Sequence, residues 1–156
     1  MCGLCGFILK DARMPDMEIL RRMTGSIRHR GPDAEGYHVE TGVGIGHRRL
    51  SIIDIEGGGQ PLYNEDGSVC VAYNGEIYNH LILRKELEDS GHVFRTRADT
   101  EVLVHLYEEY GDAMVTRLSG MFAFAIWDVI NRKLLLGRDR MGQKPLFFAE
   151  TRYGLV

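Results

Sequence analysis

A cysteine at the second position, Cys2, has the clearest capacity for chemistry in this sequence. Because cysteine is small, removal of the preceding Met1 is expected, which would leave a thiol and a free α-amine on one residue. An α-amine has an unperturbed pKa of roughly 7.7–8.0, so near neutral pH part of it can act as a base. A thiol beside such a base is an N-terminal nucleophile. The alternative is that Cys2 packs in a strand as an ordinary small apolar residue.

The segment 73–79, Tyr-Asn-Gly-Glu-Ile-Tyr-Asn, contains residue types that could assist a thiol attacking an amide. Such an attack creates an oxyanion, which the Asn74 side-chain amide and the Gly75 backbone N–H could stabilise. Glu76 could then accept a substrate ammonium. Asn-Gly between apolar segments is also the strongest short-range signal of a β-hairpin, so the residues alone leave both interpretations open.

Two further charged residues match the two ends of an amino-acid substrate. On a strand, Arg49 can point opposite to Arg48 and Leu50, and an arginine directed into a pocket suits bidentate recognition of a carboxylate. Asp99 could supply a second carboxylate for the ammonium. The alternatives are that Arg49 is exposed to solvent and that Asp99 or Thr100 caps the helix that follows.

The remaining cysteines favour neither a metal site nor a redox site. Cys2 and Cys5 form a C-x-x-C, but a structural zinc site needs four ligands, and the six histidines form no H-x3–5-H pair. A redox C-x-x-C follows a strand and begins a helix, whereas this one lies at the first residues of the chain. Cys5 is therefore interpreted as a packed strand residue.

Length and composition indicate one globular domain. The chain has 156 residues, of which 44% are hydrophobic and 26% charged, with a net charge of −3, as in ordinary globular proteins. This balance gives no electrostatic case for nucleic acid or an anionic membrane. The longest strongly apolar run, residues 121–127, is too short to span a bilayer. Without a secretory signal pattern, the expected localisation is cytoplasmic.

The apolar periodicity predicts the elements that position these residues. Apolar residues at helical spacing predict helices over residues 16–28, 79–90 and from 99 or 100 to 110. Strands are expected over residues 2–9, 37–40, 43–48, 50–55, 69–73, 121–127, 133–137 and 146–149. The apolar run 121–127 predicts a strand buried on both faces. Many strands with a few amphipathic helices indicate a layered α/β or α+β sandwich.

Eight motifs in a fixed order carry a resemblance to a known family. They are M-C-G-x-x-G-F, R-H-R-G-P-D, H-R-R-L-S-I-I-D, G-x-Q-P-L-Y, Y-N-G-E-I-Y-N, D-T-E-V, G-M-F-A-F-A-I-W-D and G-R-D-R-x-G-x-K-P-L. Through essentially its whole length the chain resembles the N-terminal glutaminase domain of glutamine-hydrolysing asparagine synthetases, a class II glutamine amidotransferase.

The resemblance implies an α+β Ntn-hydrolase fold, a four-layer αββα sandwich of two antiparallel sheets. Residues 1–156 would form one glutamine amidotransferase type-2 domain. Cys2 would be the nucleophile with its own α-amine as the base, and Asn74 with Gly75 would form the oxyanion hole. The implied glutamine contacts are Arg49 at the α-carboxylate, the backbone of Leu50, Ser51, Ile52 and Ile53, and Glu76 with Asp99 at the α-ammonium.

The resemblance also implies partners. L-glutamine would be the substrate, a C-terminal synthetase domain would act in cis, and a homodimer is allowed. No cofactor and no metal are expected in this domain, whereas ATP and Mg²⁺ are expected for the synthetase domain, whose S-G-G-x-D-S loop is not among these residues. Because residues 153–156 resemble the start of another strand, the chain is expected to be truncated before the closing strands of the domain.

Three alternatives stay open. The same glutaminase could serve another ammonia acceptor, in a secondary-metabolite or cell-surface pathway. The chain could also be a non-catalytic regulatory or assembly module that keeps the fold. N-terminal-nucleophile protease or acylase chemistry is the third, although it would not need Arg49, Glu76 and Asp99 for a free amino acid.

Overall fold

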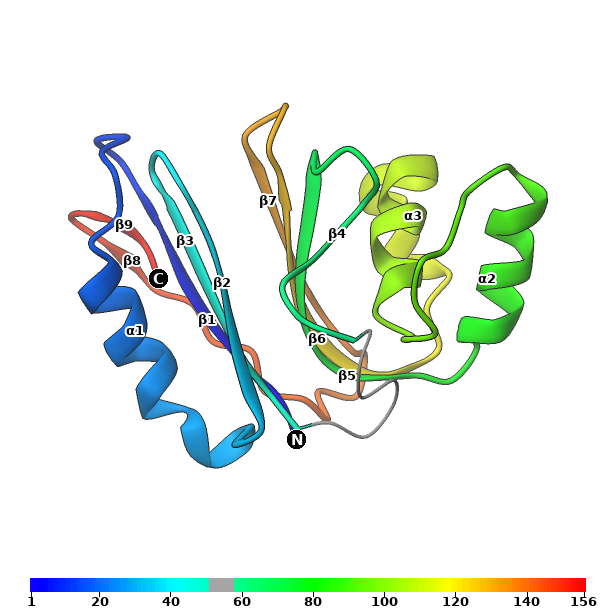
Figure 1. The fold of residues 1–156 in the computed structure, drawn as a ribbon, viewed down its shortest axis with the longest axis horizontal. Coiled ribbons are helices and arrows are strands. Elements are labelled where there is room, and N and C mark those ends of the chain that lie inside the picture. Colours follow the sequence, from blue (N-terminus) through cyan, green and yellow to red (C-terminus); the bar gives the residue numbers. More distant parts are fainter. Residues whose placement is uncertain (51–57) are drawn as a thin grey trace.

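Two antiparallel β-sheets lie face to face between two layers of helix (Figure 1). The computed structural model describes residues 1–50 and 58–156. Within these residues, sheet A has the strand order β2-β3-β1-β9-β8 and sheet B the order β4-β5-β6-β7. The predicted α+β class and the four-layer αββα sandwich of two antiparallel sheets are therefore confirmed.

Every pair of neighbouring strands in the two sheets is antiparallel. The strands of sheet A are β1 (Gly3–Leu9), β2 (Ala34–Glu40), β3 (Val43–Arg49), β8 (Glu150–Thr151) and β9 (Gly154–Leu155). The strands of sheet B are β4 (Leu62–Tyr63), β5 (Val69–Ile77), β6 (Gly120–Asp128) and β7 (Lys133–Arg138).

The helices cover the outer faces of the two sheets. α1 (Met17–Ser26) packs on β1 and β3 and is followed by a 3₁₀ turn, η1 (Arg28–Arg30). α2 (His80–Asp89), α3 (Glu101–Tyr110) and the 3₁₀ segment η2 (Gly111–Thr116) cover sheet B (Figure 1). Each α-helix begins and ends within two residues of its predicted bounds. Within the described part of the chain, no helix is long and apolar enough to cross a membrane.

The alternation of side chains along β5 separates two cores. Val69, Val71, Tyr73 and Ile77 pack with the helices that cover sheet B. Cys70 and Ala72 pack instead against sheet A. Because side chains on a strand alternate between faces, Asn74 and Glu76 are on the same face as Cys70 and Ala72. The strand therefore directs both polar side chains into the space between the sheets.

The same alternation on β3 directs Arg49 inward. Val43 and Ile45 belong to the core between the sheets, and His47 contacts the Tyr73 carbonyl of sheet B. Arg49 follows in the same register. Arg48 points the opposite way, where its Nε donates a hydrogen bond to the Thr24 carbonyl of α1. The predicted opposite orientation of the two arginines is confirmed.

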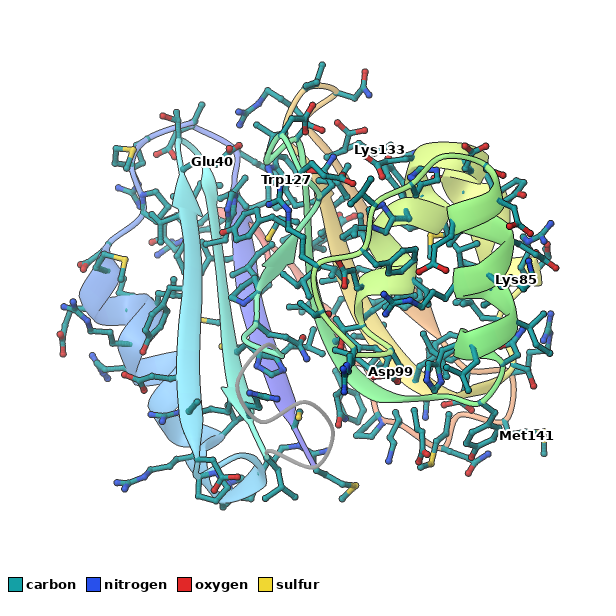
Figure 2. All side chains as sticks on the ribbon, turned by 45° about the vertical axis from the view of Figure 1, so that its right-hand side comes forward. Glu40, Lys85, Asp99, Trp127, Lys133 and Met141 are labelled. Carbon is teal, nitrogen blue, oxygen red and sulfur yellow. The ribbon has the colours of Figure 1, made fainter. Side chains whose placement is uncertain are left out.

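One hydrogen bond ties the sheets together far from the N-terminus. Trp127 on β6 donates from Nε1 to Glu40 Oε1 on β2 at 2.9 Å. Figure 2 shows both residues at the upper end of the molecule and Asp99 toward the lower end, where Figure 1 shows the N-terminus. The buried indole thus bridges the layers at one end, and Asp99 and the N-terminus lie toward the other.

The strand predicted over residues 146–149 is wrong. Phe147 and Phe148 are 88% and 68% exposed, and the described residues place no strand partner beside them. Only Ala149 exchanges backbone hydrogen bonds with a neighbour, Val156. The paired strands are the later β8 and β9. The apolar run predicted the right type of element at the wrong residues. The position of a strand depends on its pairing with other strands, which a local sequence pattern does not show.

Two other predicted strands differ in extent or lie outside the structure. β2 begins at Ala34, three residues before its predicted start. Its early residues pair with the end of β3, Ala34 with Arg49 and Glu35 with Arg48. The strand predicted over residues 50–55 lies almost wholly outside the described residues.

Burial of His47 makes the fold sensitive to acid. Its side chain is fully buried, and this burial, with a smaller effect from Arg49, lowers the pKa of His47 to about 4, although the Tyr73 carbonyl opposes the shift. The unfolded state therefore binds a proton near pH 6.5 and the folded state only near pH 4, so stability is lost as pH falls through this window. From this shift we expect a loss of about 3 kcal/mol in the free energy of unfolding.

Denaturant unfolding at several pH values measures this dependence. The His47→Gln variant should flatten the slope between pH 6.5 and 4. His38, whose pKa is also lowered by burial, remains in both proteins as a common background. An identical slope in the two proteins would contradict the assignment.

Candidate active site

A cavity of about 190 Å³ lies next to Cys2 and is lined from both sheets. This is smaller than the roughly 300–1,000 Å³ of pockets that hold drug-sized molecules, so it suits a small ligand. Its lining residues are Met1, Cys2, Arg49, Leu50, Gly58, Gln60, Tyr73, Asn74, Gly75, Glu76, Ala98, Asp99, Thr100, Met121 and Lys144. Every predicted site residue that the structure describes lines this cavity. Ser51, Ile52 and Ile53 lie outside the described residues.

The Cys2 side chain is held against the end of β3. Gly3 pairs with Arg48 across sheet A, so continuing this register brings Cys2 to the level of Arg49, next to Leu50. The Leu50 N–H donates to Cys2 Sγ at 3.4 Å, and the sulfur lies 3.7 Å from the Leu50 carbonyl oxygen. The half-buried thiol is therefore fixed at the cavity wall.

The other two cysteines are poor nucleophiles. Cys5 lies on β1, as predicted, with its sulfur 3.4 Å from Thr24 Oγ1, and burial raises the pKa of its thiol despite that contact. Burial raises the pKa of Cys70 to about 12. Since the thiolate is the reactive form, both side chains stay unreactive at neutral pH.

Asn74 and Gly75 lie in the middle of β5. They pair with Ala123 and Phe122 of β6, so the hairpin alternative is wrong. Asn74 is only 4% exposed, and its side chain forms no hydrogen bond within residues 1–50 and 58–156. A Cβ at position 75 would lie 2.2 Å from the Met121 carbonyl oxygen, so only glycine fits this strand position.

The Gly75 N–H points away from β6. The neighbouring odd-numbered residues show this direction, because Tyr73 N–H donates to Gln60 Oε1 at 2.7 Å and Ile77 N–H donates to Asp99 Oδ2 at 3.0 Å. In an antiparallel strand the N–H groups of residues i and i+2 face the same edge. The Gly75 N–H therefore faces the edge that β6 does not occupy, beside the Asn74 amide.

Asp99 is fixed by sheet B rather than used as a helix cap. Its Oδ2 accepts hydrogen bonds from the Tyr73 hydroxyl at 2.7 Å and from the Ile77 N–H. Burial and the Asp99 charge raise the pKa of Tyr73, so the phenol stays a donor. Thr100, at the N-cap position of α3, makes no side-chain capping bond. The capping alternative is therefore wrong for Asp99, whereas Thr100 is the N-cap residue by position only.

The two carboxylates and the arginine line the same cavity. Arg49 is 7% exposed and Asp99 6%, whereas Glu76 is exposed at the cavity rim. One cation from sheet A thus shares the cavity with two anions, Glu76 on sheet B and Asp99 just before α3. This is the charge pattern that a zwitterionic amino acid requires.

A family model described as a glutamine amidotransferase domain matches residues 1–156. The chain belongs to the glutamine amidotransferase family. Asparagine synthetase 2 (glutamine-hydrolyzing) of Bacillus subtilis strain 168 is 48% identical over 159 residues, which cover 100% of this chain and 21% of the relative. The corresponding enzyme 1 of the same strain is 47% identical, covering 95% of this chain and 24% of the relative.

A plant relative shows the same partial coverage. Asparagine synthetase 2 (glutamine-hydrolyzing) of Arabidopsis thaliana is 44% identical over 94% of this chain and 25% of its own length. The amidotransferase chain thus spans about a quarter of the curated relatives that it matches.

Solved structures support the fold. Glutamine phosphoribosylpyrophosphate amidotransferase from B. subtilis superposes with a TM-score of 0.77 over 99% of this chain and 41% of that chain, at 21% identity. A structure described as the allosteric regulatory enzyme of purine biosynthesis has a TM-score of 0.61 and 29% identity, covering 75% of this chain and 28% of that one. The first likeness is a likeness of fold alone.

Several residues in or beside the amidotransferase cavity were missed by the sequence analysis. Arg30 was quoted only within the R-H-R-G-P-D motif and does not line the cavity, yet its Nε donates to the Cys2 carbonyl at 3.1 Å. Gln60 lies within the G-x-Q-P-L-Y motif and holds the Tyr73 backbone. Lys144 is 7% exposed at the cavity wall, and its Nζ lies 3.5 Å from the Met1 sulfur. All three residues lie within the quoted motifs, which were the signal that the sequence offered. The sequence analysis assigned no contacts to them.

Proposed function

We propose that this chain hydrolyses the side-chain amide of L-glutamine through Cys2 and supplies the ammonia to a synthetase domain of the same protein. The observation that carries the proposal is the convergence of Cys2, the Asn74–Gly75 donors, Arg49 and Asp99 on one small cavity. Membership of the amidotransferase family and the names of the relatives, which are glutamine-hydrolyzing asparagine synthetases, support it.

The first step activates the nucleophile. Met1 is 58% exposed, so an aminopeptidase can reach it, and its removal frees the Cys2 α-amine. The amine takes the thiol proton while the sulfur attacks the amide carbon of glutamine. The negative charge that develops on the amide oxygen is stabilised by the Asn74 side chain and the Gly75 N–H.

The second step releases the products. The carbon–nitrogen bond breaks as the α-ammonium of Cys2 returns its proton to the leaving nitrogen, so ammonia departs and a thioester remains. The same amine then accepts a proton from water, which attacks the thioester carbon. Glutamate leaves and the thiol is restored.

Substrate selection follows from the charged residues. Arg49 binds the α-carboxylate and Asp99 with Glu76 binds the α-ammonium, so a free amino acid is preferred to a peptide. The backbone of residues 50–53 would complete this contact. ATP and Mg²⁺ would be used by the synthetase part of the full protein, with no role in this cavity.

Labelling with a glutamine-analogue electrophile tests the proposal. Mass spectrometry of digested protein should locate the modification on Cys2, and excess L-glutamine should prevent it. The raised thiol pKa values of Cys5 and Cys70 predict no labelling at those residues. Modification of either one in place of Cys2 would refute the mechanism.

Replacement of Arg49 should separate binding from chemistry. Loss of a charge-assisted hydrogen bond of roughly 1.5–3 kcal/mol predicts that Arg49→Ala raises KM for glutamine by roughly 10–100-fold, with a smaller change in kcat. Steady-state glutamate release measures both constants. Arg48→Ala is the matched control, because Arg48 occupies the opposite face of the same strand and pairs with Glu35. An unchanged KM in Arg49→Ala would remove Arg49 from the glutamine site.

A further inference from the structure

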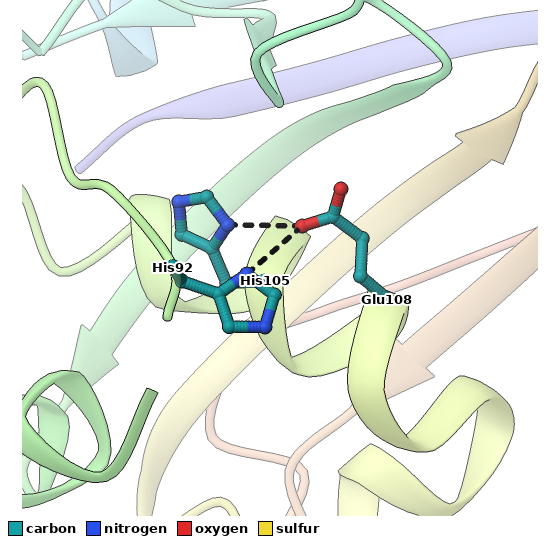
Figure 3. Close-up of side chains that lie close together, drawn as sticks. All are labelled: His92, His105 and Glu108. Atoms are coloured by element: carbon teal, nitrogen blue, oxygen red, sulfur yellow. Dashed lines mark hydrogen bonds and ion pairs between the residues drawn. The ribbon is translucent and has the colours of Figure 1, made fainter. Parts of the chain in front are cut away.

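A group of side chains outside the glutamine cavity converges beside α3 (Figure 3). His105 and Glu108 lie on α3, and His92 lies in the segment between α2 and α3. Nδ1 of His105 is 2.9 Å from Glu108 Oε2, and Nδ1 of His92 is 3.5 Å from the same oxygen. One ligand atom from each residue lies within 4.8 Å of the others.

We propose that His92, His105 and Glu108 bind a transition-metal dication of the zinc class, with Glu65 as the fourth ligand. A tetrahedral site with metal–ligand bonds of roughly 2.0–2.1 Å separates its ligand atoms by about 3.3 Å. The two contacts to Glu108 lie on either side of that value. Glu65 Oε2 is 4.0 Å from His105 Nδ1, a distance that a small side-chain rotation closes.

The second nitrogen of each histidine faces a carboxylate. His92 Nε2 is 3.0 Å from Glu109 Oε1. His105 Nε2 is 3.9 Å from Glu101 Oε1 and, although buried, has no hydrogen-bond partner. Metal-bound histidines almost always donate their other N–H to a carboxylate, a carbonyl or water, which fixes the ring orientation. The His92 ring therefore has the carboxylate support of a metal ligand, whereas His105 Nε2 faces Glu101 without a hydrogen bond.

The ligand chemistry selects the class of ion. Imidazole nitrogens with carboxylate oxygens suit zinc, cobalt and nickel, whereas magnesium and calcium prefer oxygen ligands alone. The carboxylates of Glu65 and Glu108 balance a double positive charge. His105 is 1% exposed, but the side chains of Glu108 and Glu65 are 27% and 37% exposed, so an ion can reach the site from the carboxylate side.

A bound ion would join three parts of the chain. Glu65 lies in the turn between β4 and β5, His92 begins the segment that leads to α3, and the other two ligands lie on α3 itself. The same segment continues to Asp99 and Thr100 in the cavity wall. The metal would thus be structural, fixing the segment that carries Asp99 without contacting glutamine.

Zinc titration of the full chain tests this proposal. Protein treated with a chelator and dialysed is titrated with ZnCl₂ by calorimetry, in a Cys2→Ser/Cys5→Ser background that removes the accessible thiol ligands. We expect one equivalent of bound zinc and an unfolding temperature that rises with zinc concentration. No bound zinc at micromolar concentrations would overturn the proposal.

Variants locate the ion. His92→Asn and Glu108→Gln should each weaken zinc binding by at least 100-fold, and Glu109→Gln by roughly 10–100-fold through loss of ligand support. The matched control is His29→Asn, because His29 is exposed in η1 and should leave binding unchanged. Zinc binding that persists in both His92→Asn and Glu108→Gln would mean that the cluster is only a hydrogen-bonded network.

Discussion

Replacement of Cys2 by alanine should abolish release of glutamate from L-glutamine. Removal of the nucleophile from a comparable acyl-transfer site lowers kcat by roughly 10⁶-fold, which would place the remaining rate below detection. The fold should persist, because within residues 1–50 and 58–156 the Cys2 sulfur contributes only two weak contacts, both with Leu50. A coupled assay of glutamate formation measures the rate, and thermal unfolding verifies that the variant is folded.

The control for this variant is Cys5→Ala, which removes a thiol three residues away. Cys5 packs beside Thr24 under α1 and does not line the cavity next to Cys2, so its replacement should leave glutamate release nearly unchanged. The state of the N-terminus must be verified in each protein by intact mass, because a retained Met1 acylates the amine that serves as the base. Glutamate release that survives in Cys2→Ala would show that the Cys2 thiol is not the nucleophile. Only a non-catalytic or unrelated role would then remain for it.

The residue types of the site could be predicted from the sequence, but their convergence could not. Cys2 and Asn74 lie on different sheets, and only the stacking of sheet A on sheet B brings both to one cavity. That stacking is a tertiary contact with no local signal. The period-2 pattern nevertheless gave the correct face for Arg49, because strand alternation is a local property.

Two local signals were overridden by tertiary contacts. The Asn74–Gly75 pair has hairpin propensity, yet nine consecutive residue pairs with β6 keep the chain extended through it. A turn would leave those backbone groups without partners inside the molecule, which costs more than turn propensity contributes. Similarly, Asp99 is a residue type that favours the N-cap position of a helix, but its carboxylate binds the Tyr73 hydroxyl and the Ile77 N–H. Propensity ranks local conformations, and long-range hydrogen bonds choose among them.

The role of a residue is hardest to predict when a local feature, such as a helix end, already explains its presence in the sequence. Arg30 follows α1 in a 3₁₀ turn where cations are favoured, so the sequence gives no reason to look further. Its bond to the Cys2 carbonyl depends on the approach of η1 to β3. A Cβ at Gly31 would lie 2.4 Å from the Arg48 carbonyl carbon, so this glycine permits that approach. Cys2 is thus positioned by a segment that, in the sequence, resembles only a helix end.

Replacement of Asn74 by alanine should lower kcat with little change in KM. The amide is needed where negative charge develops, and loss of one such donor costs roughly 2.7–4 kcal/mol, or 10²–10³-fold in kcat. We propose that glutamine binding rests on Arg49 and Asp99 instead, so the ground state should be affected less than the transition state. Steady-state kinetics of glutamate release measure the two constants separately.

The matched control is Asn131→Ala, which removes an amide at the turn after β6. Asn131 binds Asp128 there and does not line the cavity, so kcat should not change. Labelling of Cys2 by the glutamine analogue should survive in Asn74→Ala at a reduced rate, because the nucleophile and the binding residues remain. An unchanged kcat would mean that Asn74 does not stabilise the oxyanion, and a change confined to KM would make it a binding residue. The Gly75 N–H would then lack its partner in the oxyanion hole. The face of β5 that carries Asn74 and Glu76 would then serve recognition alone.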